Sequence, residues 1–376
     1  MSWETIQLGN FLTLKRGYDL PSSQRENGDI PVVSSSGVTG YHNVAKVKGP
    51  GVVTGRYGTL GEVFFIHEDF WPLNTALYVQ DFKGNDPKFS AYFLKSILSG
   101  ISSDKAAVPG VNRNELHARK VTVTRDLVQQ RAIAATLSTY DDLIENNRRR
   151  IALLEEAARL LYREWFVHLR FPGHEHVRVV DGVPEGWEKK AAYDVMEVLS
   201  GGTPKTKVPD YWDGDIPFYT PKDAVDYAYV ASTEKTLTEE GLRNCNSKLY
   251  PKDTVFITAR GTVGKINLVQ TAMAMNQSCY ALVAKPPVSQ YFLYFALVNG
   301  VEQFRSRAVG AVFDAIIRDT FKQIPFVVPD AKLIQTFTDH VTPILQQIDV
   351  LSTETRTLAQ ARDLLLPRLM NGEIAV

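Results

Sequence analysis

The chain has 376 residues, of which 44% are hydrophobic, 22% charged and 10% aromatic. This length and composition predict a globular protein of two or three domains. Because 42 basic residues balance 42 acidic ones, a uniformly basic nucleic-acid coat is excluded, whereas local basic loops on a neutral body are not.

The N-terminal sequence MSWETIQLGN has neither a basic nor an apolar stretch, which argues against a secretory signal. No run of 18 apolar residues follows, so the sequence predicts no membrane span. Cys245 and Cys279 are the only cysteines and offer no disulfide framework. We therefore expect a reduced, cytoplasmic protein.

Two halves of the chain repeat one ordered set of motifs. The opening WETIQLGNFLTLKRG at 3–17 corresponds to WEKKAAYDVMEVLSG at 187–201. In the same order follow GDIP in both halves, GRYGTLGEV against ARGTVGKI, PLNTALYV against AMNQSCYAL, AYFLKSILSG against QYFLYFALVNG, and LLYREWF against LLLPRLM. Two copies indicate a tandem duplication and are too few for a solenoid.

Each copy begins with a mixed segment, at 1–125 and at 187–329. Short β-rich runs, such as GVVTG in the first copy and TVFIT in the second, alternate with Gly, Pro and Asn turns. Helical patterns follow at 89–98 and 290–298. We therefore predict an α+β globular domain in each copy.

A long helix is predicted in the first spacer region, 126–170. Apolar residues recur there at alternating steps of four and three, which is the heptad pattern of a coiled coil. A helix from Leu127 to Phe166 would measure roughly 60 Å at 1.5 Å per residue. The series is Ile133, Leu137, Tyr140, Ile144, Asn147, Ile151, Leu154, Ala158, Leu161 and Trp165.

The second spacer region, 330–376, carries the same pattern with interruptions. Polar Thr355 and Arg362 are expected to weaken the seam locally. Pro343 is expected to kink or restart the helix, because proline lacks a backbone donor. The series is Phe337, Val341, Ile344, Ile348, Leu351, Thr355, Leu358, Arg362, Leu365 and Leu369.

One exposed seam of this length would be unstable in water, so each helix must either pack on its own globular domain or pair with the other helix. We favour pairing, with Asn147 helping to fix the register. The short linker 171–186 lets the chain turn back, so the two helices would be antiparallel. The predicted fold is α+β: two similar globular domains joined by two long antiparallel coiled-coil helices, a tandem duplication with pseudo-two-fold symmetry. Two similar heads suit a duplex DNA site with two half-sites.

Several features, in this order, resemble a known family. They are the W-x4-L-G opening at Trp3, the GDIP loops, the R-x-G-T-x-G turn at Arg56, the P-x-G-W start of the second copy at Pro184, and the closing LLLPRLMNGEI. Together they resemble the specificity (S) subunits of type I restriction–modification systems, the HsdS family, over essentially the whole chain. The second copy departs from the turn pattern by one residue, since Arg260 directly precedes a glycine and Arg56 does not.

The resemblance implies that 1–125 and 187–329 are target recognition domains, each reading one half of an asymmetric bipartite site in double-stranded DNA. The helices would set the spacing and dock two methyltransferase (M) subunits. The chain itself would be non-catalytic and without a cofactor. S-adenosylmethionine would belong to the M subunits, and ATP and Mg to endonuclease/translocase (R) subunits. Two other functions stay open: the detached recognition part of a fused restriction–methylation enzyme, and a coiled-coil adaptor that binds no DNA.

Motifs of the catalytic partners are missing from the sequence. No G-x4-G-K-[ST] loop occurs, and the one Pro-Pro pair lacks the flanking residues of an adenine methyltransferase. His174 and His176 lie in the linker without a third ligand nearby, so we do not predict a metal site. Cys279 is interpreted as a small buried hydrophobe rather than a redox partner of Cys245.

DNA-contacting residues are predicted on loops, where side chains reach base edges and phosphates. The Gly-flanked arginine turns, the divergent segments after the two GDIP motifs and the flexible GGTPKTK loop are the candidates. The alternative for each is an ordinary solvated loop. The candidate residues are Ser34, Ser35, Ser36, Arg56, Tyr57, Arg113, Lys205, Lys207, Tyr219, Lys222 and Arg260.

Overall fold

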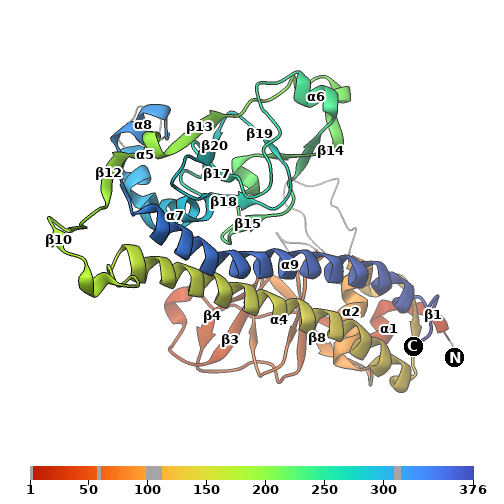
Figure 1. Ribbon diagram of the computed structural model, residues 1–376. Helices are drawn as coiled ribbons and strands as arrows, with labels where there is room; N and C mark the ends of the chain where they lie inside the picture. Colours follow the sequence, from red (N-terminus) through yellow and green to blue (C-terminus); the bar gives the residue numbers. More distant parts are fainter. Residues whose placement is uncertain (1–2, 57–60, 99–111, 309–314) are drawn as a thin grey trace. The chain divides into compact units, whose positions relative to one another are not determined.

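The computed structural model describes residues 3–56, 61–98, 112–308 and 315–376 (Figure 1). The chain divides into two compact units, Met1–Glu145 with Thr357–Val376 (unit 1) and Asn146–Arg356 (unit 2). The division falls within both long helices, α4 (Leu127–Phe166) and α9 (Ala331–Met370). Each unit therefore contains one globular domain and one stretch of each long helix.

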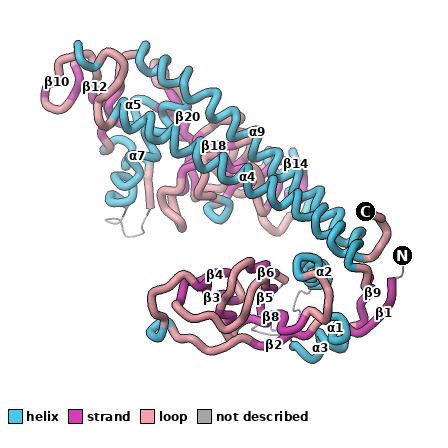
Figure 2. The backbone as a smooth tube through the Cα atoms, turned by 90° about the horizontal axis from the view of Figure 1, so that it is seen from below, coloured by secondary structure: helices cyan, strands magenta, loops and turns pink. Residues whose placement is uncertain are grey.

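Three sheets form the globular domain of unit 1, with short helices gathered at one end of the strands (Figure 2). The sheets are β1 (Trp3–Gln7) with β9 (Lys120–Thr124); β2 (Thr13–Arg16), β8 (Ala76–Asp81), β5 (Gly51–Gly55) and β6 (Val63–Ile66), in that order; and β4 (Gly37–His42), β3 (Ile30–Ser34) and β7 (Trp71–Pro72). The helices at this end are α1 (Leu8–Phe11), α2 (Pro87–Leu98) and α3 (Arg113–Ala118). The 3₁₀ turn η1 (Ser22–Gln24) comes between β2 and β3 in the chain.

Unit 2 repeats this arrangement. Its sheets are β12 (Glu188–Ala191) with β21 (Pro325–Val328); β13 (Met196–Ser200), β20 (Cys279–Ala284), β17 (Val255–Thr258), β18 (Ile266–Val269) and β15 (Tyr229–Val230); and β16 (Lys235–Leu237), β14 (Trp212–Tyr219) and β19 (Ala274–Met275). Its helices are α5 (Ala192–Val195), α6 (Glu239–Arg243), α7 (Gln290–Ala308) and α8 (Arg318–Gln323), with 3₁₀ turns η3 (Pro209–Tyr211) and η4 (Pro221–Asp223). The linker holds η2 (His174–His176) and the hairpin β10 (Val179–Val180) and β11 (Val183–Pro184).

The two strand orders correspond, except that the edge strand β15 of unit 2 has no counterpart among the described strands of unit 1. In both domains the first strand pairs antiparallel with the strand that precedes the long helix. The GDIP motif leads into β3 or lies in β14, and each of these strands has one antiparallel and one parallel neighbour. Strands β5 and β17 are buried along their whole length, in keeping with their mostly apolar sequences GVVTG and VFIT. The predicted duplicated α+β fold is thus confirmed.

Each stretch of long helix packs both on its domain and on the other helix. In unit 1 one core joins Phe89 and Phe93 of α2 to Leu137 of α4 and to Leu366 and Leu369 of α9. In unit 2 another core joins α7, α4 and α9 through a cluster of rings: Tyr162, Trp165, Phe166, Phe292, Phe295 and Phe337. The two explanations that the sequence analysis opposed, docking on the domain and pairing of the helices, therefore both hold.

Within each unit α4 and α9 run antiparallel, side by side (Figure 1). In unit 1 Asp141 of α4 faces Arg362 of α9, with Oδ1 and Nη1 2.5 Å apart. In unit 2 the rings of Trp165 and His340 are 5.5 Å apart. Every residue of both heptad series is buried or half-buried, and the packing also uses Leu345, Leu366 and Met370, which lie outside the second series.

Helix α9 continues unbroken through Pro343, so the predicted restart at this residue is wrong. Pro343 is exposed, while Val341 and Leu345 beside it are buried. Their packing outweighs the one backbone hydrogen bond that proline removes. None of the described helices, these two long ones included, is apolar enough over a sufficient length to cross a membrane.

Candidate nucleic-acid interface

Four loops of unit 2 line one open depression of about 420 Å³. They follow β13, β14, β17 and β19, so strand ends position all of them. Lys222 and Arg260, both exposed, contribute to its wall together with Trp212 and Asn276. The structure thus brings together two predicted contact residues from segments far apart in the sequence.

Two further predicted residues, Lys205 and Lys207, are exposed on the first of these loops. They flank Thr206, which lines the depression. Lys235 also lines it, with its ammonium 5.5 Å from the ring centre of Trp212. The sequence analysis missed Lys235, because this residue lies in a short strand rather than in a recognisable loop motif.

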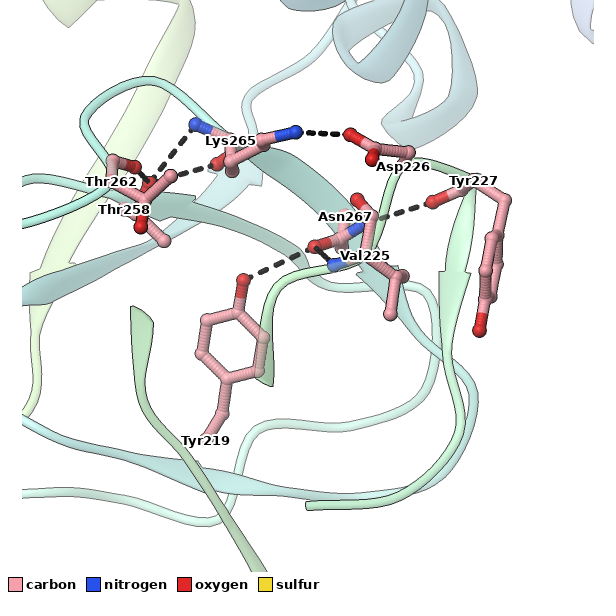
Figure 3. A network of polar contacts seen from close by, with 8 residues as sticks. All are labelled: Tyr219, Val225, Asp226, Tyr227, Thr258, Thr262, Lys265 and Asn267. Carbon is pink, nitrogen blue, oxygen red and sulfur yellow. Dashed lines mark hydrogen bonds and ion pairs between the residues drawn. The ribbon is translucent and has the colours of Figure 1, made fainter. Parts of the chain in front are cut away.

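Tyr219 is fully buried, so the prediction that it contacts DNA is wrong. Its ring packs on Phe256 with 5.2 Å between centroids, and its hydroxyl donates to Oδ1 of Asn267 at 3.1 Å (Figure 3). The buried Asn267 amide in turn donates to the carbonyls of Val225 and Tyr227 at 3.1 and 2.8 Å. Burial raises the pKa of Tyr219. This residue therefore anchors the end of β14 and the loop behind it.

The turn that carries Lys222 is held by its own hydrogen bonds. Asp223 accepts from the backbone N–H and the hydroxyl of Thr220, at 2.8 and 2.7 Å. Its other carboxylate oxygen accepts from the backbone N–H of Glu234 at 2.7 Å. Lys222 thus projects from a turn that is fixed on both sides.

Thr258 and Ser278 hold the turn that carries Arg260. The Thr258 hydroxyl donates to the carbonyl of Thr262 and accepts from the backbone N–H of Lys265 at 2.9 Å (Figure 3). The carbonyl of Ser278 accepts from the backbone N–H of Arg260 at 3.3 Å. The main chain of the turn is fixed, and Arg260 itself lines the open depression.

Unit 1 contains the equivalent turn. The backbone N–H of Arg56 donates to the carbonyl of Thr75 at 3.0 Å, and Thr54 donates to the carbonyl of Glu62 at 2.8 Å. Both arginines are therefore anchored alike, although one extra residue, Tyr57, follows in the first copy. Tyr57 lies outside the described residues. The threonine two residues before each arginine is the signal in the sequence that could have indicated this equivalence.

The loops that follow β2 and β13 are held in the same way in the two units. A side-chain bond joins Asp19 to Asn74 in unit 1, and Thr203 to Gln277 in unit 2. A Cβ on Gly17 would lie 2.3 Å from the carbonyl oxygen of Leu73, and one on Gly201 would lie 2.2 Å from that of Asn276. Both glycines are required by this close approach.

Ser34 builds the hairpin turn between β3 and β4. It is only 8% exposed, its hydroxyl lies 3.0 Å from that of Ser36 and it donates to the carbonyl of Gly37 at 3.3 Å. Its polar atoms are used within the turn, which argues against a DNA contact by Ser34. Ser36 is exposed and Ser35 half-buried, so both remain candidates. Arg113 is exposed on α3, where its guanidinium bonds to neighbouring Asn114.

Metal and thiol chemistry find little support in the described part of the chain. It contains no group of three or more His, Cys, Asp or Glu side chains arranged to hold a metal ion. His174 and His176 each lie within 4 Å of Glu175. Cys245 and Cys279 are both free thiols, and burial raises the pKa of Cys279.

Comparison with known proteins yields one family. A family model described as the type I restriction modification DNA specificity domain matches residues 1–156 and 184–355. The specificity subunit of the type I restriction enzyme MjaIX of Methanocaldococcus jannaschii is 29% identical over 180 residues, which are 45% of this chain and 42% of that protein. The specificity subunit of HindI of Haemophilus influenzae is 29% identical over 195 residues, 51% of this chain and 42% of that protein. The matched part thus spans less than half the length of these two relatives.

A solved structure resembles the whole chain in fold. The S subunit of a type I restriction–modification system from M. genitalium superposes with a TM-score of 0.65 at 18% identity, over 98% of this chain and 96% of that one.

Proposed function

Because this chain belongs to the family of type I restriction–modification DNA specificity domains, we propose that it is the sequence-specific DNA-recognition subunit of a type I restriction–modification complex. Each globular domain reads one half of an asymmetric bipartite site, and the helix pair sets the half-site spacing. The chain is non-catalytic and has no cofactor of its own. Its partners are double-stranded DNA, two methyltransferase subunits, which bind S-adenosylmethionine, and endonuclease/translocase subunits, which bind ATP and Mg.

The observation that carries this proposal is the double match of the family model, once in each repeat. The anchored arginine turns support it, since Arg56 and Arg260 hold equivalent places in the two domains. The neighbouring loops differ, with Ser35 and Ser36 in one domain against Lys222 in the other. Similar scaffolds with different loops fit two half-sites of different sequence.

The basic side chains of unit 2 are suited to different kinds of DNA contact. Arginine bonds in a bidentate manner to O6 and N7 of guanine, so Arg260 is the candidate for a base contact. Lys205 and Lys207 are flexible point charges, which suits phosphates. Base contacts give sequence specificity, while phosphate contacts give salt-dependent affinity.

The test is binding by the full chain in complex with a methyltransferase subunit of the same system. Methylome sequencing of cells with both proteins defines the split site, and fluorescence anisotropy then measures affinity for that site and for duplexes with one half-site scrambled. We expect Arg260→Ala to lose about tenfold in affinity and to relax one base position. Arg178→Ala, which removes an exposed arginine of the linker, is the matched control and should bind normally.

Lysine variants separate the two kinds of contact. Lys205→Ala with Lys207→Ala should weaken binding equally for all sequences and reduce the dependence of affinity on salt. If the unmodified complex bound scrambled and intact sites equally well, the chain would not be a specificity subunit. Binding of protein partners without any DNA would favour the adaptor function instead.

A further inference from the structure

Three polar side chains of unit 1 join the globular domain to both long helices. Tyr92 of α2 donates its hydroxyl hydrogen to Oδ2 of Asp141 in α4, at 2.5 Å. The other carboxylate oxygen of Asp141 accepts from Nη1 of Arg362 in α9, also at 2.5 Å. We call these three residues the clasp. Because these residues lie on three different helices, they join α2, α4 and α9 at one point.

The clasp is partly buried. The Arg362 side chain is 15% exposed, the Asp141 side chain is 37% exposed, and Tyr92 as a residue is 7% exposed. An ion pair that water reaches contributes only about 0–1 kcal/mol to stability, and apolar residues of similar volume often give equal or greater stability. Stability alone therefore does not explain polar residues at this position of the seam.

The hydrogen bonds of the clasp are directional, whereas the apolar contacts around it are not. Apolar contacts between helices tolerate sliding and rotation, whereas hydrogen bonds weaken steeply when distance or angle changes. One residue of slip along an α-helix is a shift of 1.5 Å with a rotation of about 100°. Such a slip would break both bonds of Asp141 at once, so the clasp permits a single orientation of α2 on the helix pair.

We propose that the clasp is a specificity-determining positioning element, which fixes the orientation of the first globular domain on the helix pair and thereby the half-site spacing that the protein accepts. This inference rests on the proposed function. Adjacent base pairs are about 3.4 Å apart, so a reoriented domain that moves its DNA-facing loops by that distance accepts a spacer changed by one base pair.

Unit 2 fixes its domain with different chemistry. Asp349 of α9 accepts from Gln270 at 2.7 Å and from Lys252 at 2.5 Å, while Glu155 of α4 accepts from the backbone N–H of Ala228 at 2.5 Å. None of these contacts involves a clasp residue, so substitutions in the clasp leave them unchanged. The two half-sites can therefore be tested separately.

The experiment uses the full chain in complex with its methyltransferase and a series of duplexes with unchanged half-sites and the spacer shortened or lengthened by one base pair. Tyr92→Phe removes one hydroxyl and keeps the ring. The double variant Asp141→Leu with Arg362→Leu replaces the ion pair by apolar groups. Asp363→Asn is the matched control. Asp363 is the exposed second partner of Arg362, 2.8 Å away, and lies on the same helix, so this ion pair does not join α9 to another element.

We expect both clasp variants to lose at least about tenfold in discrimination between the correct spacer and its neighbours, equivalent to 1.4 kcal/mol. Discrimination against a scrambled half-site and the melting temperature should stay near those of the unmodified protein, and the control should behave normally. Unchanged spacer discrimination in folded Tyr92→Phe and in the double variant would overturn the inference. If the unmodified complex recognised no split site, the proposed function itself would fail.

Discussion

The backbone N–H of Leu14 donates a hydrogen bond to Nε2 of His117 at 2.9 Å. This nitrogen accepts only when the imidazole is neutral. Burial lowers the pKa of His117, and the nearby charges of Arg113 and Lys83 lower it further. The bond joins α3 to β2 in unit 1, so the protonation state of His117 is linked to folding.

Unit 1 should therefore lose stability as the pH falls below about 6.5, the ordinary pKa of histidine. Because the pKa of His117 is lower in the folded state, the unfolded state binds the proton more readily, and this contribution is present above pH 6.5 and lost below it. Urea unfolding of the unmodified chain and of His117→Gln at pH 8, 7, 6 and 5 measures the effect. His117→Gln should show the shallower decline, and equal declines would rule out this histidine as the cause.

Asn147 offers a route to higher stability. It is 4% exposed in the helix pair, and its Nδ2 has no hydrogen-bond partner among the described residues. An unpaired buried amide costs about 1–3 kcal/mol, so Asn147→Leu should raise the free energy of unfolding by about 1–2 kcal/mol. Asn146→Leu, at the exposed neighbouring position, should not. Destabilisation by Asn147→Leu would mean that the amide has a partner.

The heptad pattern was sufficient to predict the first long helix, since α4 runs from Leu127 to Phe166 as expected. A period of 3.5 residues over so many turns has no other regular structure that fits it. The motif pairs likewise predicted two domains of one topology. That Asn147 sets the helix register remains a prediction.

Side-chain direction at loop edges could not be predicted. Tyr219 belongs to a sequence that is typical of a turn, yet it is the last residue of β14 and lies between Phe256 and Asn267. Whether such a residue points inward depends on strands that pair from distant parts of the chain. Arg362 illustrates the same limit, because its partner Asp141, which also accepts from Tyr92, is visible only in three dimensions.

Gly201 should not tolerate a side chain. A Cβ there would lie 2.2 and 2.4 Å from two carbonyl oxygens, those of Asn276 and Met275. Because backbone atoms cannot move aside without shifting the loop, Gly201→Ala should cost about 1–3 kcal/mol. Gly300→Ala is the control, since nothing lies within 4 Å of its Cβ position in α7 and alanine favours the helix. A neutral Gly201→Ala in thermal unfolding would show that the loop can shift freely.

Thr258→Val tests how Arg260 is positioned. The variant keeps the shape of a fully buried side chain and removes the hydroxyl that bonds Thr262 and Lys265. We expect a loss of about 1–3 kcal/mol in stability and faster hydrogen exchange of the Lys265 amide. DNA affinity should fall in the Arg260-containing protein but not further in Arg260→Ala, because the hydroxyl acts through that turn. Additive losses in the double variant would contradict this.

Phe337 should be the most sensitive residue of the helix pair in unit 2. It is fully buried, and its ring lies 5.8 Å from that of Tyr162, 5.1 Å from that of Phe166 and 5.8 Å from that of Phe295. Truncation of such a phenylalanine leaves a large cavity, so Phe337→Ala should cost about 3–5 kcal/mol, against a total of about 5–15 kcal/mol for a typical domain.

His340→Ala is the control for Phe337→Ala, because His340 packs on Trp165 from an exposed position one turn away. Its loss should cost less than about 1 kcal/mol. Since Phe337 joins α7, α4 and α9, its truncation should also lower the exchange protection of α4 and α7 together. Loss of protection in α9 alone would mean that the three helices do not share one core.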